Sequence, residues 1–221
     1  FKILRSNITN KFINGPVSKK KFLNKKYLGV TEFISKKFKY KKTAMLIYND
    51  ELSVCPLTTH LPVKLIAKKI SRKLISETID IIDCFYKKHL NKKAKIAVTG
   101  LNPHCESILK FNEDEKILPI VIKNKFKKGI NVKGPYSADT IFLKNNRKNY
   151  NVILGMYHDQ VLTPLKTLYN FDAINITIGL PFIRISPDHG PNISMYGKNK
   201  SDPSSIFCAM DFLNKIDENN S

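Results

Sequence analysis

The amino-acid sequence predicts an α/β fold with a mostly parallel sheet and helices on both of its faces. Short runs rich in Ile and Val alternate with longer amphipathic stretches, the pattern of strands joined by helices. Hydrophobic residues make up 42% of the 221 residues, which excludes disorder through low hydrophobicity. No apolar run approaches the length that spans a bilayer, and no apolar signal segment stands near the start. We therefore expect a cytoplasmic protein without a membrane partner.

The strands and helices can be placed in order along the chain. Strands are predicted at 44–48, 52–57, 95–99, 152–156 and 173–178. Between the second and third strands, apolar residues recur at three- and four-residue steps from Pro62 to Leu90, and Ser71 is a candidate cap for a second helix inside that stretch. Asn112 and Glu115 form a capping-box pattern for a helix that ends at Gly129.

The remaining helices are shorter or interrupted. Pro119 is expected to kink or shorten the helix that follows Asn112. Further helices are predicted at 137–143, at 159–168, where Pro164 argues against the assignment, and at 204–216.

The chain is strongly basic, with 38 Lys and Arg against 18 Asp and Glu and a formal net charge of +20. A basic surface attracts phosphate groups, so a nucleic-acid partner is one interpretation of this charge. The Lys residues are scattered among many Asn and Ile, however, as on solvated helix faces, and we predict no nucleic-acid partner. The four cysteines are widely spaced without a C-x-x-C pair, which indicates thiols of a reducing compartment.

Three of the five histidines directly follow predicted strands. His60 follows 52–57, His104 follows 95–99 and His158 follows 152–156. If these strands are parallel, the three imidazoles project from one edge of the sheet, where they can bind a divalent metal. Neutral imidazoles favour zinc over magnesium, although cobalt, manganese and magnesium stay open. The alternative is three separate polar turn residues, because no H-x-x-x-H spacing is present.

A second polar set lies downstream, formed by Lys166, Asn175 and Arg184. An Arg and a Lys together suit a phosphate or carboxylate, and an Arg in an apolar segment needs an anionic partner. The alternative is a solvated surface pair. The loop Asp188-His189-Gly190 follows, and Gly190 lets the backbone approach a ligand. Neither a G-x-G-x-x-G fingerprint nor a P-loop is present.

Taken together, these segments resemble the 4-hydroxythreonine-4-phosphate dehydrogenase family of pyridoxal phosphate biosynthesis. The matching segments are Asn14-Gly15-Pro16-Val17, Gly29-Val30-Thr31-Glu32-Phe33, Thr58-Thr59-His60-Leu61-Pro62, Gly100-Leu101-Asn102-Pro103-His104, Gly134-Pro135-Tyr136-Ser137-Ala138-Asp139-Thr140, Tyr157-His158-Asp159-Gln160, the run from Asn175 to Arg184, and Asp188-His189-Gly190. The resemblance implies a fold like those of isocitrate and isopropylmalate dehydrogenases, with two α/β domains flanking a cleft. It also implies a homodimer whose site is built between subunits.

The resemblance implies a role for each matching residue. The metal ligands would be His60, His104 and His158, and the substrate-binding residues would be Thr31, Lys166, Asn175 and Arg184. The catalytic set would be Asp139, Asp159 and Lys166, and the cofactor-binding residues His189 and Gly190. The two aspartates are candidates for orienting metal ligands or for proton transfer, with helix-start residues as the alternative.

The implied reaction is the metal-assisted oxidation of 4-phosphooxy-L-threonine by NAD. Loss of carbon dioxide from the resulting keto acid would give 3-amino-2-oxopropyl phosphate. A metal ion would lower the pKa of the substrate hydroxyl, and phosphate binding away from the reacting carbon would orient the substrate.

Three departures from the family pattern shape the remaining expectations. Val30 stands where the family has His, and Cys105-Glu106-Ser107-Ile108 replaces a Gly-rich continuation. The chain starts at Phe1, and its first motif normally lies well inside the family's chain, so we expect an N-terminal part to be missing. Residues 22–190 would then form the metal- and substrate-binding domain, and 1–21 and 191–221 would be remnants of a second domain. The alternatives are a dehydrogenase of a 4-phosphorylated tetronate and a degenerate, non-catalytic fragment.

Overall fold

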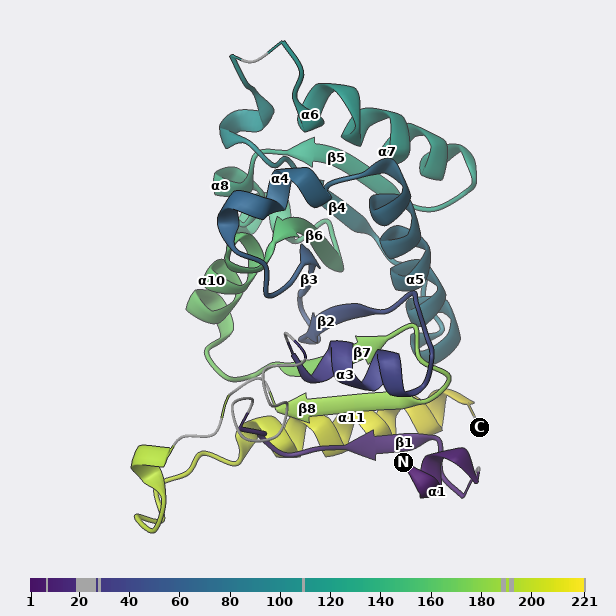
Figure 1. The fold of residues 1–221 in the computed structure, drawn as a ribbon, viewed down its shortest axis with the longest axis vertical. Coiled ribbons are helices and arrows are strands. Elements are labelled where there is room, and N and C mark those ends of the chain that lie inside the picture. Colours follow the sequence, from purple (N-terminus) through teal and green to yellow (C-terminus); the bar gives the residue numbers. More distant parts are fainter. Residues whose placement is uncertain are drawn as a thin grey trace.

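A single mixed sheet organises the chain (Figure 1). The computed structural model describes residues 1–6, 8–18, 27, 29–108, 110–187, 190 and 193–220. In these ranges the sheet has eight strands in the order β1-β8-β7-β2-β3-β6-β4-β5. Their bounds are β1 Lys11–Ile13, β2 Ala44–Tyr48, β3 Ser53–Thr58, β4 Ile96–Thr99, β5 Val132–Tyr136, β6 Val152–Tyr157, β7 Ile174–Ile178 and β8 Ile183–Pro187.

The sheet combines a parallel half with an antiparallel centre. Strands β3, β6, β4 and β5 are parallel neighbours, and β1 is parallel to β8. Strand β2 is antiparallel to both β3 and β7, and β7 is antiparallel to β8. The chain between β2 and β3 is too short for a crossover, so these strands form a hairpin, with Asn49 accepting a hydrogen bond from the Glu51 backbone N–H at 2.9 Å. The α/β prediction is confirmed. The antiparallel pairings of β2 and β7 were not part of that prediction.

Three strands were not predicted, and each has a physical reason. Strand β1 has three residues, too few for an alternating pattern to show. Strand β5 contains Gly134 and Pro135, which weaken the signal but fit its place at the edge of the sheet. In β8 a buried Arg184 and Ser186 interrupt the apolar pattern. The five predicted strands match β2, β3, β4, β6 and β7 to within one residue at each end.

Alternate residues of the central strands pack into separate cores on the two faces of the sheet. In β2, Leu46 belongs to one buried cluster, whereas Met45 and Ile47 belong to the other. The first face is covered by α5 (Arg72–Leu90), α7 (Leu118–Lys127) and α11 (Ser204–Asn220), and the second by α10 (His158–Tyr169) (Figure 1). Burial on both faces explains why the strands are nearly continuous apolar runs.

The predicted caps are confirmed. Ser71 accepts a hydrogen bond from the Leu74 N–H at the start of α5, and Asn112 accepts one from the Glu115 N–H. The helix after Asn112 breaks at Ile117 into α6 (Glu113–Lys116) and α7, where Pro119 occupies the first turn, and Gly129 follows at φ 82°. Helix α10 contains Pro164.

The other helices are short. They are α1 (Lys2–Arg5), α3 (Val30–Lys37), α4 (Ile66–Lys69), α8 (Ala138–Ile141) and α9 (Lys144–Arg147). The described part of the chain contains no helix with both the length and the apolar character needed to cross a membrane.

Candidate active site

A cavity of about 530 Å³ opens on the face of the sheet that α10 covers. Helices α3 and α10, strands β2, β7 and β8, and the loop after β1 contribute to its wall. Six of the predicted site side chains line it together with Gly190: Thr31, His60, His158, Lys166, Asn175 and Arg184. The structure therefore gathers residues from segments far apart in the sequence into one cavity.

Arg184 is the buried cation of this cavity, with 2% of its surface exposed. Its Nε donates to Asn14 Oδ1 at 2.7 Å, and its Nη1 donates to Thr177 Oγ1 at 3.1 Å. Burial lowers the pKa of Arg184 to about 10, and the negative charge of Glu32 opposes this shift. Among the described residues no carboxylate forms an ion pair with Arg184, so its buried charge is available to an anionic ligand.

The neighbouring polar side chains come from one face of β7 and β8. Strand pairing aligns Thr177 with Arg184 and Asn175 with Ser186, so the two-residue period puts all four on the same face. Thr31 in the first turn of α3 lies against this row, with its Oγ1 3.4 Å from Thr177 Oγ1. The Oδ1 atom of Asn175 is buried and has no hydrogen-bond partner among the described residues. A ligand hydroxyl or ammonium group would satisfy it.

The two histidines of the cavity are brought together by the parallel pairing of β3 and β6. Thr58 is aligned with Tyr157, so His60 and His158 leave the sheet side by side. Their ring centroids are 5.9 Å apart. Two imidazoles at this separation can serve as ligands to one metal ion.

The third histidine is directed elsewhere. His104 follows β4, on the far side of β6, and does not line the cavity. Its loop is fixed by buried Asp114, which accepts hydrogen bonds from the backbone N–H groups of Leu101 and Asn102 at 2.6 and 3.0 Å. Within the described ranges, no three His, Cys, Asp or Glu side chains come together as a metal site. A single copy of the chain thus offers two of the three predicted ligands in one place.

Each of the three histidines nevertheless presents Nδ1 to a carboxylate. The distances are 3.7 Å from His60 to Glu32, 4.0 Å from His104 to Asp139, and 2.7 Å from His158 to Asp159. A carboxylate at one ring nitrogen favours a proton there and leaves the other nitrogen free to bind a metal. The donor set therefore fits a metal ion in its chemistry. Asp139 and Asp159, both exposed, lie beside histidines and not in the cavity wall.

Some residues fall outside the predictions or outside the described ranges. His189, a predicted cofactor-binding residue, lies outside the described residues. Asn14, Thr177 and Glu32 contribute to the site but were not predicted to do so. A polar residue at every second position of β7 was the available signal for Thr177. Glu32 stands in a quoted motif, and nothing in its spacing distinguishes it from an ordinary first-turn acid.

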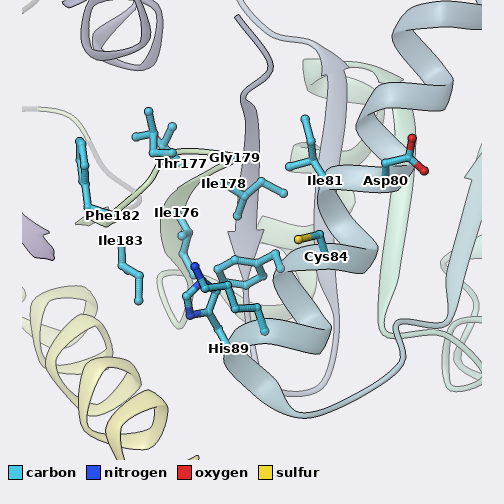
Figure 2. A pocket seen from close by; sticks show the side chains of 13 residues that line it. Asp80, Ile81, Cys84, His89, Ile176, Thr177, Ile178, Gly179, Phe182 and Ile183 are labelled. Atoms are coloured by element: carbon cyan, nitrogen blue, oxygen red, sulfur yellow. The ribbon is translucent and has the colours of Figure 1, made fainter. Parts of the chain in front are cut away.

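Another cavity, of about 350 Å³, lies on the opposite face of the sheet (Figure 2). It is bounded by α5 and β7, with Cys84 and Ile81 of α5 facing the strand, and its lining is mainly apolar. It holds none of the predicted site residues.

The fold is an α/β fold that this chain shares with several dehydrogenases of known structure. Isocitrate dehydrogenase from Methylococcus capsulatus matches 97% of this chain and 70% of its own with a TM-score of 0.60, at 12% identity, which establishes the fold alone. 4-Hydroxythreonine-4-phosphate dehydrogenase from Klebsiella pneumoniae matches 97% of this chain and 67% of its own, with a TM-score of 0.82 and 29% identity.

The family model of the pyridoxal phosphate biosynthetic protein PdxA matches residues 2–213, and the chain belongs to this family. A 4-hydroxythreonine-4-phosphate dehydrogenase from Sulfurihydrogenibium is 38% identical over 84% of this chain and 58% of its own length. The D-threonate 4-phosphate dehydrogenase of Salmonella typhimurium is also 38% identical, over 81% of this chain and 56% of its own. The chain thus spans little more than half the length of these relatives.

Proposed function

We propose that the chain is the metal- and substrate-binding part of an NAD-dependent 4-hydroxythreonine-4-phosphate dehydrogenase. The reaction would convert 4-phosphooxy-L-threonine into 3-amino-2-oxopropyl phosphate, with release of carbon dioxide, in the cytoplasmic synthesis of pyridoxal phosphate. The observation that carries the proposal is the placing of buried Arg184, Lys166 and Asn175 in one cavity with His60 and His158. Family membership and the relatives' names support it.

The residues of the cavity divide the work of binding. Arg184 and Lys166 bind the anionic groups of the substrate, and the buried site of Arg184 strengthens that attraction. Thr31 and Asn175 hydrogen-bond its neutral polar groups and fix its orientation. Lys166 is also the candidate proton-transfer group, since His158, the other ionisable side chain of α10 in the cavity wall, is assigned to the metal. Gly190 lines the same cavity and is assigned to NAD together with His189.

His60 and His158 would hold the divalent metal, with Asp159 orienting His158. The ion, when bound, supplies positive charge that lowers the pKa of a substrate hydroxyl and stabilises negative charge left by decarboxylation. Zinc suits imidazole ligands, and cobalt, manganese or magnesium would also serve once substrate oxygens complete the site.

We assign the third ligand to a second copy of the chain. His104 is absent from the cavity wall of its own subunit, and a homodimer with the site at the subunit interface would supply it from the other. Asp139 would orient His104 as Asp159 orients His158. The division into a 22–190 domain and remnants at 1–21 and 191–221 stays a prediction.

A second candidate substrate is a tetronate 4-phosphate such as D-threonate 4-phosphate. Val30 lines the cavity at the position where the family has a histidine, and its isopropyl group can form no hydrogen bond. Relatives named for threonate and for hydroxythreonine phosphates are equally similar to this chain.

The deciding experiment is NADH formation by the purified protein with metal and either substrate. Higher kcat/KM with 4-phosphooxy-L-threonine supports the proposed function, and higher kcat/KM with D-threonate 4-phosphate supports the second. If Val30 sets the choice, Val30→His will shift the ratio toward 4-phosphooxy-L-threonine. Metal binding without NADH from either substrate would overturn both and favour a non-catalytic fragment.

A further inference from the structure

Glu32 and His60 pack against each other and against Gly29, so a side chain at position 29 would have to displace them. A Cβ atom added to Gly29 would lie 2.6 Å from Glu32 Oε2, 2.9 Å from His60 Cε1 and 3.0 Å from His60 Nδ1. The backbone at Gly29 has φ −157°, a conformation open to every residue, so conformational freedom is not the reason for glycine here. Glycine allows the present arrangement, because the carboxylate and the imidazole ring both pack against this position.

A hydrogen bond from Thr59 holds the carboxylate of Glu32 in place. Its Oε1 accepts a hydrogen bond from Thr59 Oγ1 at 2.9 Å. The same oxygen lies 3.7 Å from His60 Nδ1, beyond hydrogen-bond distance, so it acts on that nitrogen through its charge. Its Oε2 is buried and has no hydrogen-bond partner among the described residues. Glu32 does not line the cavity, so any influence on a ligand there passes through His60 or through its electric field.

We infer that Glu32 is a positioning residue, which keeps His60 protonated on Nδ1 and so presents Nε2 as the metal-binding nitrogen. The inference rests on the proposed function, since it concerns the same site. It gives His60 the carboxylate partner that Asp159 gives His158. Glu32 is the more enclosed of the two, with 33% of its side chain exposed against 81% for Asp159.

Glu32 should also affect the anion site at Arg184, where its negative charge lowers affinity for an anion instead of raising affinity for a cation. Glu32 adjoins Thr31, whose Oγ1 lies 3.4 Å from the Thr177 hydroxyl to which Arg184 donates, and its negative charge favours the charged guanidinium. The same charge that attracts a cation to His60 therefore competes with an anion for Arg184. Removing it should weaken metal binding and strengthen anion binding. Loss of folding would weaken both, so the two effects separate a positioning role from a structural one.

The test compares Glu32→Gln with the parent protein. Titration with Zn²⁺ or Co²⁺ should show an affinity about 10- to 100-fold lower, the usual cost of losing a carboxylate behind a ligating histidine. Titration with inorganic phosphate should show a higher affinity. Two-bond ¹H–¹⁵N spectra of the histidine rings should show His60 with its proton on Nδ1 in the parent and a mixture of tautomers in the variant. Glu51→Gln is the matched control, because Glu51 is exposed in the β2–β3 turn and should change none of the three.

Gly29→Ala provides an independent variant that keeps the charge. The added methyl group would displace both the Glu32 carboxylate and the His60 ring and so separate them. The tautomer should therefore change while phosphate affinity stays near the parent's. An Nε2–H tautomer in the parent, or unchanged metal affinity and tautomer in Glu32→Gln, would overturn the inference. Failure of the parent to bind metal would refute the proposed metal centre, and the tautomer spectra would still decide the role of Glu32.

Discussion

At the scale of single residues, Arg184 is the group on which the proposed anion binding would depend most. Its guanidinium is held by Asn14 and Thr177, so it is presented to the cavity in one orientation. Arg184→Lys keeps the charge but loses the hydrogen bond from Nε to Asn14 and the two-pronged geometry. We expect affinity for the phosphorylated substrate to fall by about 10- to 100-fold, the weight of one or two charge-assisted hydrogen bonds. Isothermal titration measures this affinity, and Arg5→Lys, at an exposed position, is the control. Equal substrate affinities of the parent and Arg184→Lys would contradict the role given to Arg184.

The Asp50 cluster predicts a pH dependence of stability away from the site. Burial acts to raise the pKa of Asp50, but hydrogen bonds from Lys215 and Tyr48 outweigh it and leave the pKa below its ordinary value. The charged form therefore stabilises the folded state. This contribution is complete above the unfolded pKa of about 3.9 and is lost as the pH falls through the lower folded value.

Asp50→Asn should accordingly lower the free energy of unfolding at pH 7 by about 1 kcal/mol or less, since the ion pair is largely exposed. The difference from the parent should shrink on acidification below the ordinary carboxyl pKa. Urea unfolding at pH 7 and at a pH below the ordinary carboxyl pKa measures this difference. Asp211→Asn, on an exposed position of α11, is the control. A difference that is independent of pH would refute the explanation.

Residue chemistry made part of the site predictable from the sequence. His60 and His158 were identifiable as imidazoles after strands, and Lys166 and Arg184 as charges near apolar segments, which are uncommon without a partner. The contributions of Asn14 and Glu32 depend on which distant segments pack against Arg184 and His60. That packing depends on the register of β1 against β8 and on the position of α3, and local spacing does not reveal either.

At the scale of elements, the approach of α10 to the sheet depends on Gly155 in β6. A Cβ atom there would lie 2.3 Å from Val161 Cγ1, and Val161 is fully buried. Gly155→Ala should lower the free energy of unfolding by about 1–3 kcal/mol through overpacking. Because α10 begins at His158, the same change should also displace a predicted metal ligand.

A double-mutant cycle checks this explanation. Val161→Ala removes the methyl group nearest the added Cβ, so the double variant should lose less stability than the sum of the two single changes. Urea unfolding of all four proteins gives the coupling energy. Simple additivity would show that Gly155→Ala acts through something other than contact with α10.

Elements with strong local signals were predictable, and the directions of the strands were not. Caps at Ser71 and Asn112 and the break near Pro119 follow from local chemistry, and the structure confirms them. The sequence of β2 gives no indication that it runs against β3 and β7, because a strand buried on both faces is apolar in either direction. Edge strand β5 was not predicted at all, because Gly134 and Pro135 interrupt its apolar pattern.

At the scale of the whole molecule, the parallel half of the sheet separates the three histidines into two groups. Neighbouring strands β3 and β6 place His60 beside His158, whereas β4 carries His104 past β6 toward Asp139. The prediction that all three project from one edge is compatible with this order. However, only His60 and His158 of the three line the same cavity in one copy of the chain. If a second subunit completes the metal centre, His60 and His158 belong to one subunit at each site and His104 to the other.

This arrangement predicts complementation between inactive variants. His60→Ala and His104→Ala homodimers should each lack activity and metal affinity. In a mixed dimer, the variant side chains fall together in one site, and the other site has all three histidines intact. Random pairing makes half of the dimers mixed, each with one working site of two, so about a quarter of the parent's activity should return.

The matched control for this experiment is a mixture of His60→Ala and His158→Ala. These residues share a subunit at each site, so every site in the mixed dimer lacks one ligand and no activity should return. Co-expression followed by NADH formation and Co²⁺ titration measures both mixtures. Recovery in neither mixture would place all three ligands within one subunit or remove His104 from the site. Recovery in the first alone would show that the assembled dimer, and not the single chain, is the unit that holds the metal.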